Sequence, residues 1–149
     1  ICEGLVGSEM CIRDRSRGMF VTMIVGVYDK NKNELLLANA GHEPPLIFSK
    51  DGNFKTIDEA GPPLGIAPNF KFSEQTISFK ESSMYIFTDG ITEMKNNNGE
   101  MLGQEGFQDY IKKYQTTPNN KRLQKMIEDL ISSGRIQKDD LTIVTVDGN

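Results

Sequence analysis

The sequence predicts an α+β fold in which two helices pack on a mostly antiparallel sheet. Three observations favour it: short Val-, Ile- and Thr-rich segments separated by turns over 19–88, helical periodicity over 107–131, and a last apolar segment at 141–146. Segments rich in β-branched residues and bounded by turn residues are typical of strands. The 149 residues are enough for one domain with a sizeable core.

The expected strands share a high content of β-branched and aromatic residues. They cover 19–28, 34–39, 46–48, 54–57, 70–79, 84–88 and 141–146. Polar or Gly- and Pro-rich turns separate them at 29–33, 40–45, 51–52 and 61–65. Asp51-Gly52 is a strong hairpin signal. The alternation within 70–79 is imperfect.

Two amphipathic helices are expected between the last two strands. The first has an apolar stripe with the spacing i, i+3, i+4, i+7, made by Phe107, Tyr110, Ile111 and Tyr114. The second repeats this spacing with Leu123, Met126, Ile127, Leu130 and Ile131. Asn119 or Asn120 is expected to cap the start of the second helix, and Gly134 its end.

Composition and charge exclude several classes of protein. Hydrophobic residues make up 37% and charged residues 26%, which is typical of a soluble globular domain. No apolar run approaches the roughly 20 residues that cross a bilayer. The net charge of −4, without a basic stripe, gives no general attraction to nucleic acid.

The first 15 residues differ from the rest of the chain. They read ICEGLVGSEMCIRDR, have no helical or strand period, and contain both cysteines, Cys2 and Cys11. This segment resembles a translated sequencing adapter, so we expect residues 1–15 to be non-native and 16–149 to form the domain. The two cysteines then predict neither a disulfide nor a metal site.

Two pairs of residues mark a candidate metal site. Asp89-Gly90 follows the strand at 84–88, and Asp139-Asp140 precedes the strand at 141–146. If these strands are adjacent and antiparallel, Asp89 and Asp139 meet at one edge of the sheet. Converging carboxylates repel each other unless they share a proton or a cation. Hard divalent ions such as Mg²⁺ and Mn²⁺ prefer oxygen ligands of this kind.

Five short segments resemble one family in their order and spacing. They are 38–46 (ANAGHEPPL), 63–66 (PLGI), 87–93 (FTDGITE), 99–103 (GEMLG) and 139–142 (DDLT). Together they resemble the SpoIIE/RsbU branch of the PPM-type, metal-dependent serine/threonine phosphatases. Glu43 stands where that family often has Asn. The acidic strand and Gly-His-Gly segment that open the family's domain have no counterpart before Met19.

The resemblance implies a PPM-phosphatase-like β-sandwich flanked by helices, truncated at its N-terminus. It implies that Asp89 and Asp139 are metal ligands in a site for two Mn²⁺ or Mg²⁺ ions in the complete domain. Asp140 is expected behind them as a hydrogen-bonding or outer-sphere residue. Gly90 is expected to supply backbone, through a positive φ or a close approach to the metal. We expect the 149-residue chain alone to be inactive.

The resemblance also implies a substrate and partners. The expected activity is hydrolysis of phosphoserine or phosphothreonine on a STAS-type anti-sigma-factor antagonist, in bacterial partner switching. An N-terminal sensor or receiver domain is expected in the full-length protein, and a homodimer is left open. The location would be the cytoplasm, or the cytoplasmic part of a membrane-anchored sensor. The alternative is a non-catalytic regulatory module, a pseudophosphatase that binds partners without turnover.

Two other interpretations concern single features of the sequence. Residues 89–100 have the length of an EF-hand loop, but Ile91 and Met94 stand where that loop needs an oxygen ligand and a glycine. His42 is the only histidine of the chain. It could act as a general acid, but its place after Gly41 and before two prolines favours a role in shaping the turn.

Overall fold

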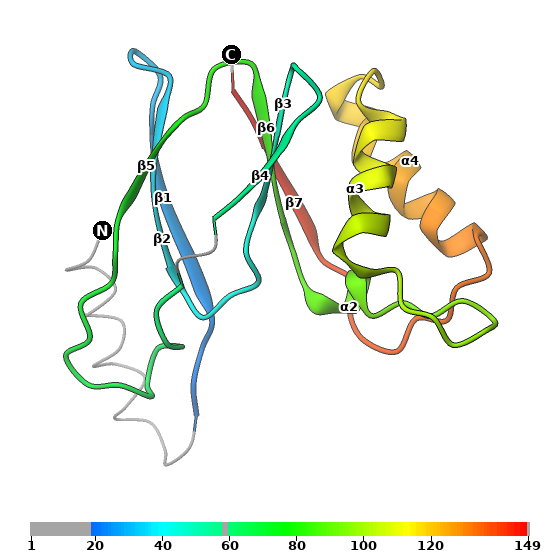
Figure 1. Cartoon of the computed structure of the whole chain (residues 1–149), viewed down its shortest axis with the longest axis horizontal. Helices are drawn as coiled ribbons and strands as arrows, with labels where there is room; N and C mark the ends of the chain where they lie inside the picture. Colours follow the sequence, from blue (N-terminus) through cyan, green and yellow to red (C-terminus); the bar gives the residue numbers. More distant parts are fainter. Residues whose placement is uncertain (1–18, 58–59, 149) are drawn as a thin grey trace.

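The computed structural model describes residues 19–57 and 60–148 and arranges them in three layers (Figure 1). A small sheet, a larger sheet and a pair of helices follow one another across the molecule. The expectation for residues 1–15, with Cys2 and Cys11, lies outside the described residues. The layers confirm the α+β class that the sequence predicts.

The first layer is a three-stranded antiparallel sheet in the order β1-β2-β5. Its strands are β1 (Met23–Asp29), β2 (Glu34–Ala40) and β5 (Gln75–Ser78). β1 and β2 form the hairpin that the polar turn predicts. The Asp29 carboxylate stabilises this turn, because its Oδ1 accepts hydrogen bonds from the backbone amides of Asn31 at 2.9 Å and Lys32 at 3.2 Å.

The second layer is a four-stranded antiparallel sheet in the order β4-β3-β6-β7. Its strands are β4 (Phe54–Thr56), β3 (Leu46–Ser49), β6 (Ser82–Phe87) and β7 (Ile143–Asp147). The pairing of β6 with β7 runs from Ser83↔Asp147 to Phe87↔Ile143. The end of β6 therefore lies beside the start of β7, which is the arrangement expected for the two aspartate segments.

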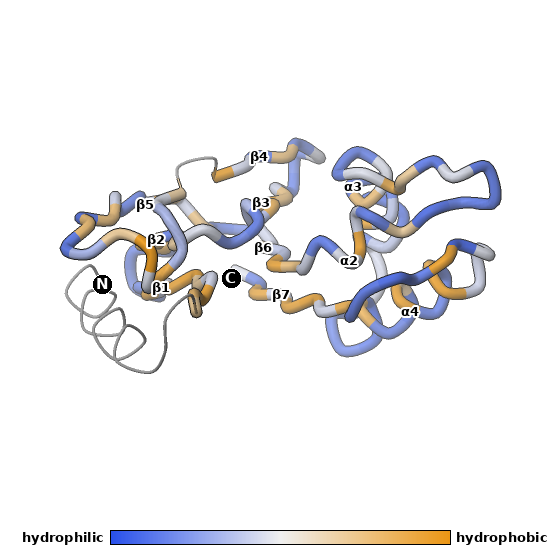
Figure 2. Tube along the Cα trace, turned by 90° about the horizontal axis from the view of Figure 1, so that it is seen from below, coloured by the Kyte–Doolittle hydropathy of each residue, from blue (hydrophilic) through white to orange (hydrophobic). Residues whose placement is uncertain are grey.

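The third layer consists of helices α3 (Gly103–Tyr114) and α4 (Asn119–Ser132), and the one-turn helix α2 (Asp89–Thr92) connects β6 to it. Figure 2 shows α3 and α4 side by side at one end of the molecule and the three-stranded sheet at the other. The centres of the predicted apolar stripes face the sheet, since Phe107, Ile111, Met126 and Leu130 are all fully buried, whereas Ile131, expected in the second stripe, is 57% exposed. None of the described helices is long and apolar enough to cross a bilayer.

Side-chain alternation along β3 and β6 produces two cores, one on each face of the four-stranded sheet. Ile47 and Met84 pack between the sheets, in a cluster completed by Leu35, Leu37, Ile57, Ile77 and Phe79. Their strand neighbours Phe48 and Tyr85 face the opposite way and join the helix residues, with Phe107 in contact with both Tyr85 and Phe87. The central sheet is therefore covered on both faces.

A buried ion pair ties α4 to the end of β7. Arg122 of α4 is 5% exposed and donates to Asp147 Oδ1, which also accepts a 2.5 Å hydrogen bond from the Ser83 hydroxyl. The Arg122 guanidinium lies 5.6 Å from the centre of the Tyr85 ring. Burial raises the pKa of the Tyr85 hydroxyl, so this group stays neutral beside the ion pair.

Two predicted details differ in the structure, and a third is confirmed. The strand expected over 70–79 is confined to β5, because Phe72 packs instead against Ala38, Ala40 and Leu64 on the outer face of the first sheet. α4 begins directly after Pro118 with no side-chain cap, so the expected Asn cap is wrong. Gly134, with a φ of 75°, does follow the helix end as predicted.

Candidate metal site

The candidate site begins where β6 ends. Thr88 is extended, and Asp89 is the first residue of α2. The backbone carbonyl of Asp89 accepts hydrogen bonds from the Glu93 amide at 2.8 Å and from the Thr92 hydroxyl at 3.1 Å. Ile91, fully buried, anchors this single turn in the core. The Asp-Gly turn expected from the sequence is therefore the first half of a short helix, and it leaves the Asp89 side chain exposed.

The segment that precedes β7 lies directly against this turn. The ladder extends one step beyond Phe87, where the Thr88 amide donates to the Thr142 carbonyl at 3.2 Å. A Cβ at position 90 would overlap the Asp140 carbonyl oxygen and lie 3.4 Å from the Asp139 carbonyl carbon. Only glycine allows this approach. The two aspartate segments, 50 positions apart in sequence, therefore have their backbones in contact.

The conformation and contacts of Gly90 differ from those expected from the sequence. It lies inside α2 and is not among the described glycines with positive φ. The structure shows a close approach of Gly90 to the backbone of Asp139 and Asp140, whereas the expected approach to a metal stays a prediction. The glycine thus acts on the position of the second carboxylate segment.

Asp139 and Asp140 are both exposed at the edge of the sheet. The Asp139 carboxylate accepts a hydrogen bond from the Asp140 amide at 2.7 Å, and the Asp139 carbonyl accepts one from Gln137 Nε2 at 3.0 Å. These local bonds give the segment a defined bend.

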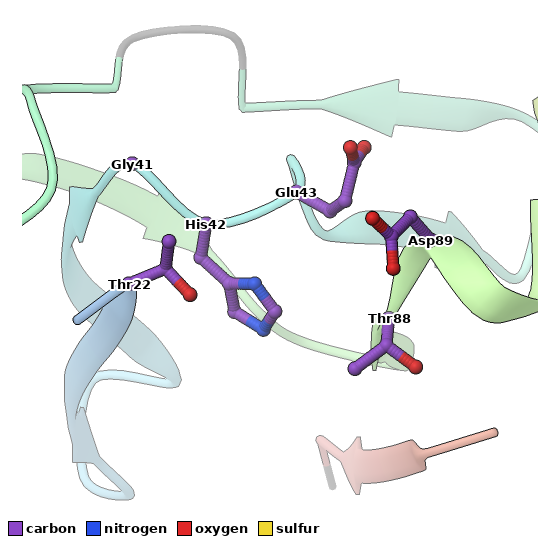
Figure 3. Close-up of a pocket in the computed structure, with 6 residues that line it drawn as sticks. All are labelled: Thr22, Gly41, His42, Glu43, Thr88 and Asp89. Atoms are coloured by element: carbon purple, nitrogen blue, oxygen red, sulfur yellow. The ribbon is translucent and has the colours of Figure 1, made fainter. Parts of the chain in front are cut away.

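A cavity of about 170 Å³ opens beside Asp89. Its described lining residues are Thr22, Gly41, His42, Glu43, Thr88 and Asp89 (Figure 3). In Figure 3 the Glu43 and Asp89 carboxylates lie near each other, and the His42 ring lies between Thr22 and Thr88. Asp139 and Asp140 are not among these lining residues; they approach Asp89 through Gly90.

Asn39 is a residue that the sequence interpretation missed. Its side chain is 2% exposed and bonds both backbone groups of His42: Nδ2 donates to the carbonyl and Oδ1 accepts from the amide, each at 2.9 Å. Asn39 therefore holds the backbone of the turn that the sequence attributes to His42, and the His42 ring lines the cavity. A lone Asn in the apolar run LLLANA was the available signal.

The side chains at this edge suit a hard divalent cation. Asp89, Asp139 and the nearby Glu43 offer carboxylate oxygens, and Gly90 brings the two aspartate segments together without a side chain of its own. Within residues 19–57 and 60–148, no group of three or more His, Cys, Asp or Glu side chains is arranged to hold a metal by itself. The residues fit a part of a metal site.

Comparisons with known sequences identify the family and relatives of this chain. Residues 8–148 match the family model described as Stage II sporulation protein E (SpoIIE). Protein IcfG of Synechocystis sp. is 30% identical over 136 residues, and the phosphoserine phosphatase RsbU of Bacillus subtilis is 28% identical over 131 residues. Each alignment covers 86% of this chain, but only 20% of IcfG and 39% of RsbU, so the chain spans a minor part of either protein.

Solved structures show the same fold. The RsbU and RsbW domains of Rv1364c from Mycobacterium tuberculosis match with a TM-score of 0.80 at 22% identity, over 97% of this chain and 41% of that one. The Mn-presoaked phosphatase domain of SpoIIE from Bacillus subtilis matches with a TM-score of 0.67 at 17% identity, over all of this chain and 66% of that one. The fold is that of PPM phosphatase domains, and the family match over nearly the whole chain shows that it belongs to the SpoIIE family.

Proposed function

We propose that this chain is the C-terminal part of the catalytic domain of a metal-dependent protein serine/threonine phosphatase. The observation that carries the proposal is the contact of Asp89-Gly90 with Asp139-Asp140 across the β6–β7 pair, beside a polar cavity. The relative RsbU, named a phosphoserine phosphatase, supports the same reaction. Residues 16–149 would form this part of the domain, preceded by a non-native segment at 1–15.

The site residues have distinct roles in this proposal. Asp89 and Asp139 bind Mn²⁺ or Mg²⁺ through their carboxylates, and the complete domain holds two such ions. Asp140 lies behind them as a hydrogen-bonding or outer-sphere residue. Gly90 provides the backbone contact that brings Asp139 and Asp140 up to Asp89. The Mn-presoaked structure of the SpoIIE phosphatase domain supports the choice of metal.

The reaction is hydrolysis of a phosphate monoester by water. The bound ions would supply a water of lowered pKa and positive charge for the phosphoryl oxygens. This chain's own contribution is the negative charge of Asp89 and Asp139, which holds the cations in place. The Thr22 hydroxyl and the His42 ring line the cavity and provide polar surface toward a phosphoryl group.

The proposed substrate is a phosphorylated STAS-type anti-sigma-factor antagonist, within bacterial partner switching. RsbU and the protein with joined RsbU and RsbW domains support this assignment. An N-terminal sensor or receiver domain would regulate the activity in the full-length protein, which would also be able to form a homodimer. The site would then work in the cytoplasm, either in a free protein or in the cytoplasmic part of a membrane-anchored sensor.

The test is phosphate release from a phosphorylated STAS protein by the full-length protein that carries this chain, across a Mn²⁺ titration. The expected result is turnover that depends on Mn²⁺ and disappears with a chelator. A full-length protein that binds the phosphorylated partner but releases no phosphate at any Mn²⁺ or Mg²⁺ concentration would establish the alternative, a non-catalytic pseudophosphatase.

A further inference from the structure

The Thr88 hydroxyl joins the two aspartate segments of the candidate site. Thr88 Oγ1 donates a hydrogen bond to the Asp140 carbonyl at 3.0 Å and accepts one from the Thr142 amide at 3.1 Å. A threonine hydroxyl has one proton to donate, and here that proton is committed to the backbone beside Asp139. Both partners lie more than fifty positions away in the sequence.

These bonds lie where the regular sheet ends. The last β6–β7 pair is Phe87↔Ile143, and the Thr88 amide makes one further backbone bond, to Thr142. Beyond that bond, the Thr88 side chain continues the connection toward Asp140. Removing the hydroxyl would leave the Thr142 amide and the Asp140 carbonyl without this partner at the exposed edge of the sheet.

The same segment has a second restraint of a different kind. Gly90 allows the backbones of the two segments to touch, but a steric fit only limits how close they come. The Thr88 bonds are directional and fix how the Asp139-Asp140 backbone is oriented. The two restraints come from Thr88 and Gly90, the residues on either side of Asp89.

We infer that Thr88 is a positioning residue for the divalent cation: its hydroxyl holds the Asp139-Asp140 backbone against Asp89-Gly90, so that the Asp89 and Asp139 carboxylates can bind one ion together. The inference rests on the proposed function. Outer-shell partners of metal ligands typically contribute about 10- to 100-fold in metal affinity. We expect a loss of that size when the hydroxyl is removed.

The experiment compares Thr88→Val, which keeps the shape but removes the hydroxyl, with Thr88→Ser, which keeps the hydroxyl. The matched control is Thr145→Val, a half-buried threonine of the same strand pair. Mn²⁺ binding to the full-length protein is measured from the electron paramagnetic resonance signal of free Mn²⁺. Hydrogen exchange at the Thr142 amide reports the bond directly.

Thr88→Val should weaken Mn²⁺ binding about 10- to 100-fold and speed exchange at the Thr142 amide, while Thr88→Ser and Thr145→Val stay within a few-fold of the parent. If Thr88→Val does not fold, Thr88→Ala replaces it in the same comparison. Parent-like Mn²⁺ binding by the hydroxyl-free variant would overturn the inference. Asp89→Asn serves as the reference: if it also binds Mn²⁺ like the parent, the proposed metal site itself fails.

Discussion

Asp89 and Asp139 reach one edge of the four-stranded sheet by opposite routes, one after a strand and the other before its neighbour. The antiparallel pairing of β6 with β7, a condition of the sequence argument, is met in the structure, and the place of each aspartate beside an apolar run was predictable from the sequence. The contact through Gly90 and the bonds of Thr88 were not, since they depend on how far the ladder continues past Phe87. The local sequence pattern thus predicted where the carboxylates lie along the chain. Their contacts with each other's segments depend on the register of the β6–β7 pairing.

The first prediction concerns the charge of the two proposed ligands. Asp89→Asn and Asp139→Asn keep the shape of the side chain but remove the negative charge that a hard cation needs. In the full-length protein, each should lower phosphate release from a phosphorylated STAS partner by more than about 100-fold, beyond the usual effect of an outer-shell residue. Fold and partner binding should persist, as circular dichroism and a pull-down would verify.

His42→Ala is the matched comparison for these variants. The backbone of the turn is held by Asn39, so the variant should keep the loop and lose only one polar side chain from the cavity. We expect a much smaller loss of turnover than for either aspartate. Abolished turnover in His42→Ala, with near-parental turnover in Asp139→Asn, would reverse the assigned roles.

The second prediction concerns the packing at Gly90. Gly90→Ala places a methyl group onto the Asp140 carbonyl oxygen, so the two segments must move apart. Overpacking of this kind costs about 1–3 kcal/mol in the free energy of unfolding, and the separated carboxylates should bind Mn²⁺ more weakly. Urea unfolding measures the first effect and Mn²⁺ titration the second. The control is Gly26→Ala, whose new Cβ would make an ordinary 3.4 Å contact with Leu35, so a similar loss there would argue against a specific fit at Gly90.

At the scale of elements, helical and strand periods predicted the order of the structure well and its boundaries less well. The stripe of α3 was clear because Phe107 and Ile111 recur on one face. The strand at 70–79 was too long, because Phe70 and Phe72 alternate like strand residues, but Phe72 packs on the first sheet from a loop and Phe70 contacts the Phe72 ring. The cap of α4 failed because Pro118, with its fixed φ, already sets the start of the helix.

Hydrophobic periodicity could not predict the buried ion pair between α4 and β7. Arg122 reads as a polar helix position, yet it is buried between Tyr85 and Asp147. The third prediction is that Asp147→Ala destabilises the protein by about 3–5 kcal/mol, because it leaves the Arg122 charge buried without its partner. The midpoint of urea unfolding is the measurement.

An exposed ion pair between the two helices provides the control. Lys113 and Asp129 pair at 2.5 Å with side-chain exposures of 59% and 29%. Asp129→Ala should change the free energy of unfolding by no more than about 1 kcal/mol, since exposed pairs are weak. Equal effects of Asp147→Ala and Asp129→Ala would mean that burial does not distinguish the two pairs.

At the scale of the whole molecule, the two sheets differ in how fully they are covered. The four-stranded sheet is covered on both sides, whereas the three-stranded sheet has β1 at its edge, with Val27 56% exposed. Met19, Phe20 and Val21, just before β1, are also exposed. Within the part of the chain that the structure describes, β1 has no strand on its outer side, and an exposed apolar surface next to an unpaired strand edge favours association between chains.

The fourth prediction follows from this surface. The isolated 149-residue chain should aggregate in dilute buffer, and Val27→Lys should slow the aggregation by placing a charge on the edge strand. Ile131→Lys, at an exposed position of α4, is the control and should have little effect. Light scattering with time is the measurement. A sharp, reversible thermal transition of a monomeric parent chain would contradict the prediction.

The fifth prediction concerns activity of the isolated chain. Its described residues contain no group of three or more His, Cys, Asp or Glu side chains that holds a metal alone, and the chain spans 66% of the SpoIIE phosphatase domain it resembles. Two exposed carboxylates retain most of their hydration and bind Mn²⁺ weakly, because the cation must lose water for few ligands. We therefore expect little or no Mn²⁺-dependent hydrolysis of p-nitrophenyl phosphate by the 149-residue chain, and clear hydrolysis by the full-length protein under the same conditions. Robust activity of the short chain would show that these residues form a working site by themselves, and the division of the metal ligands proposed above would be wrong.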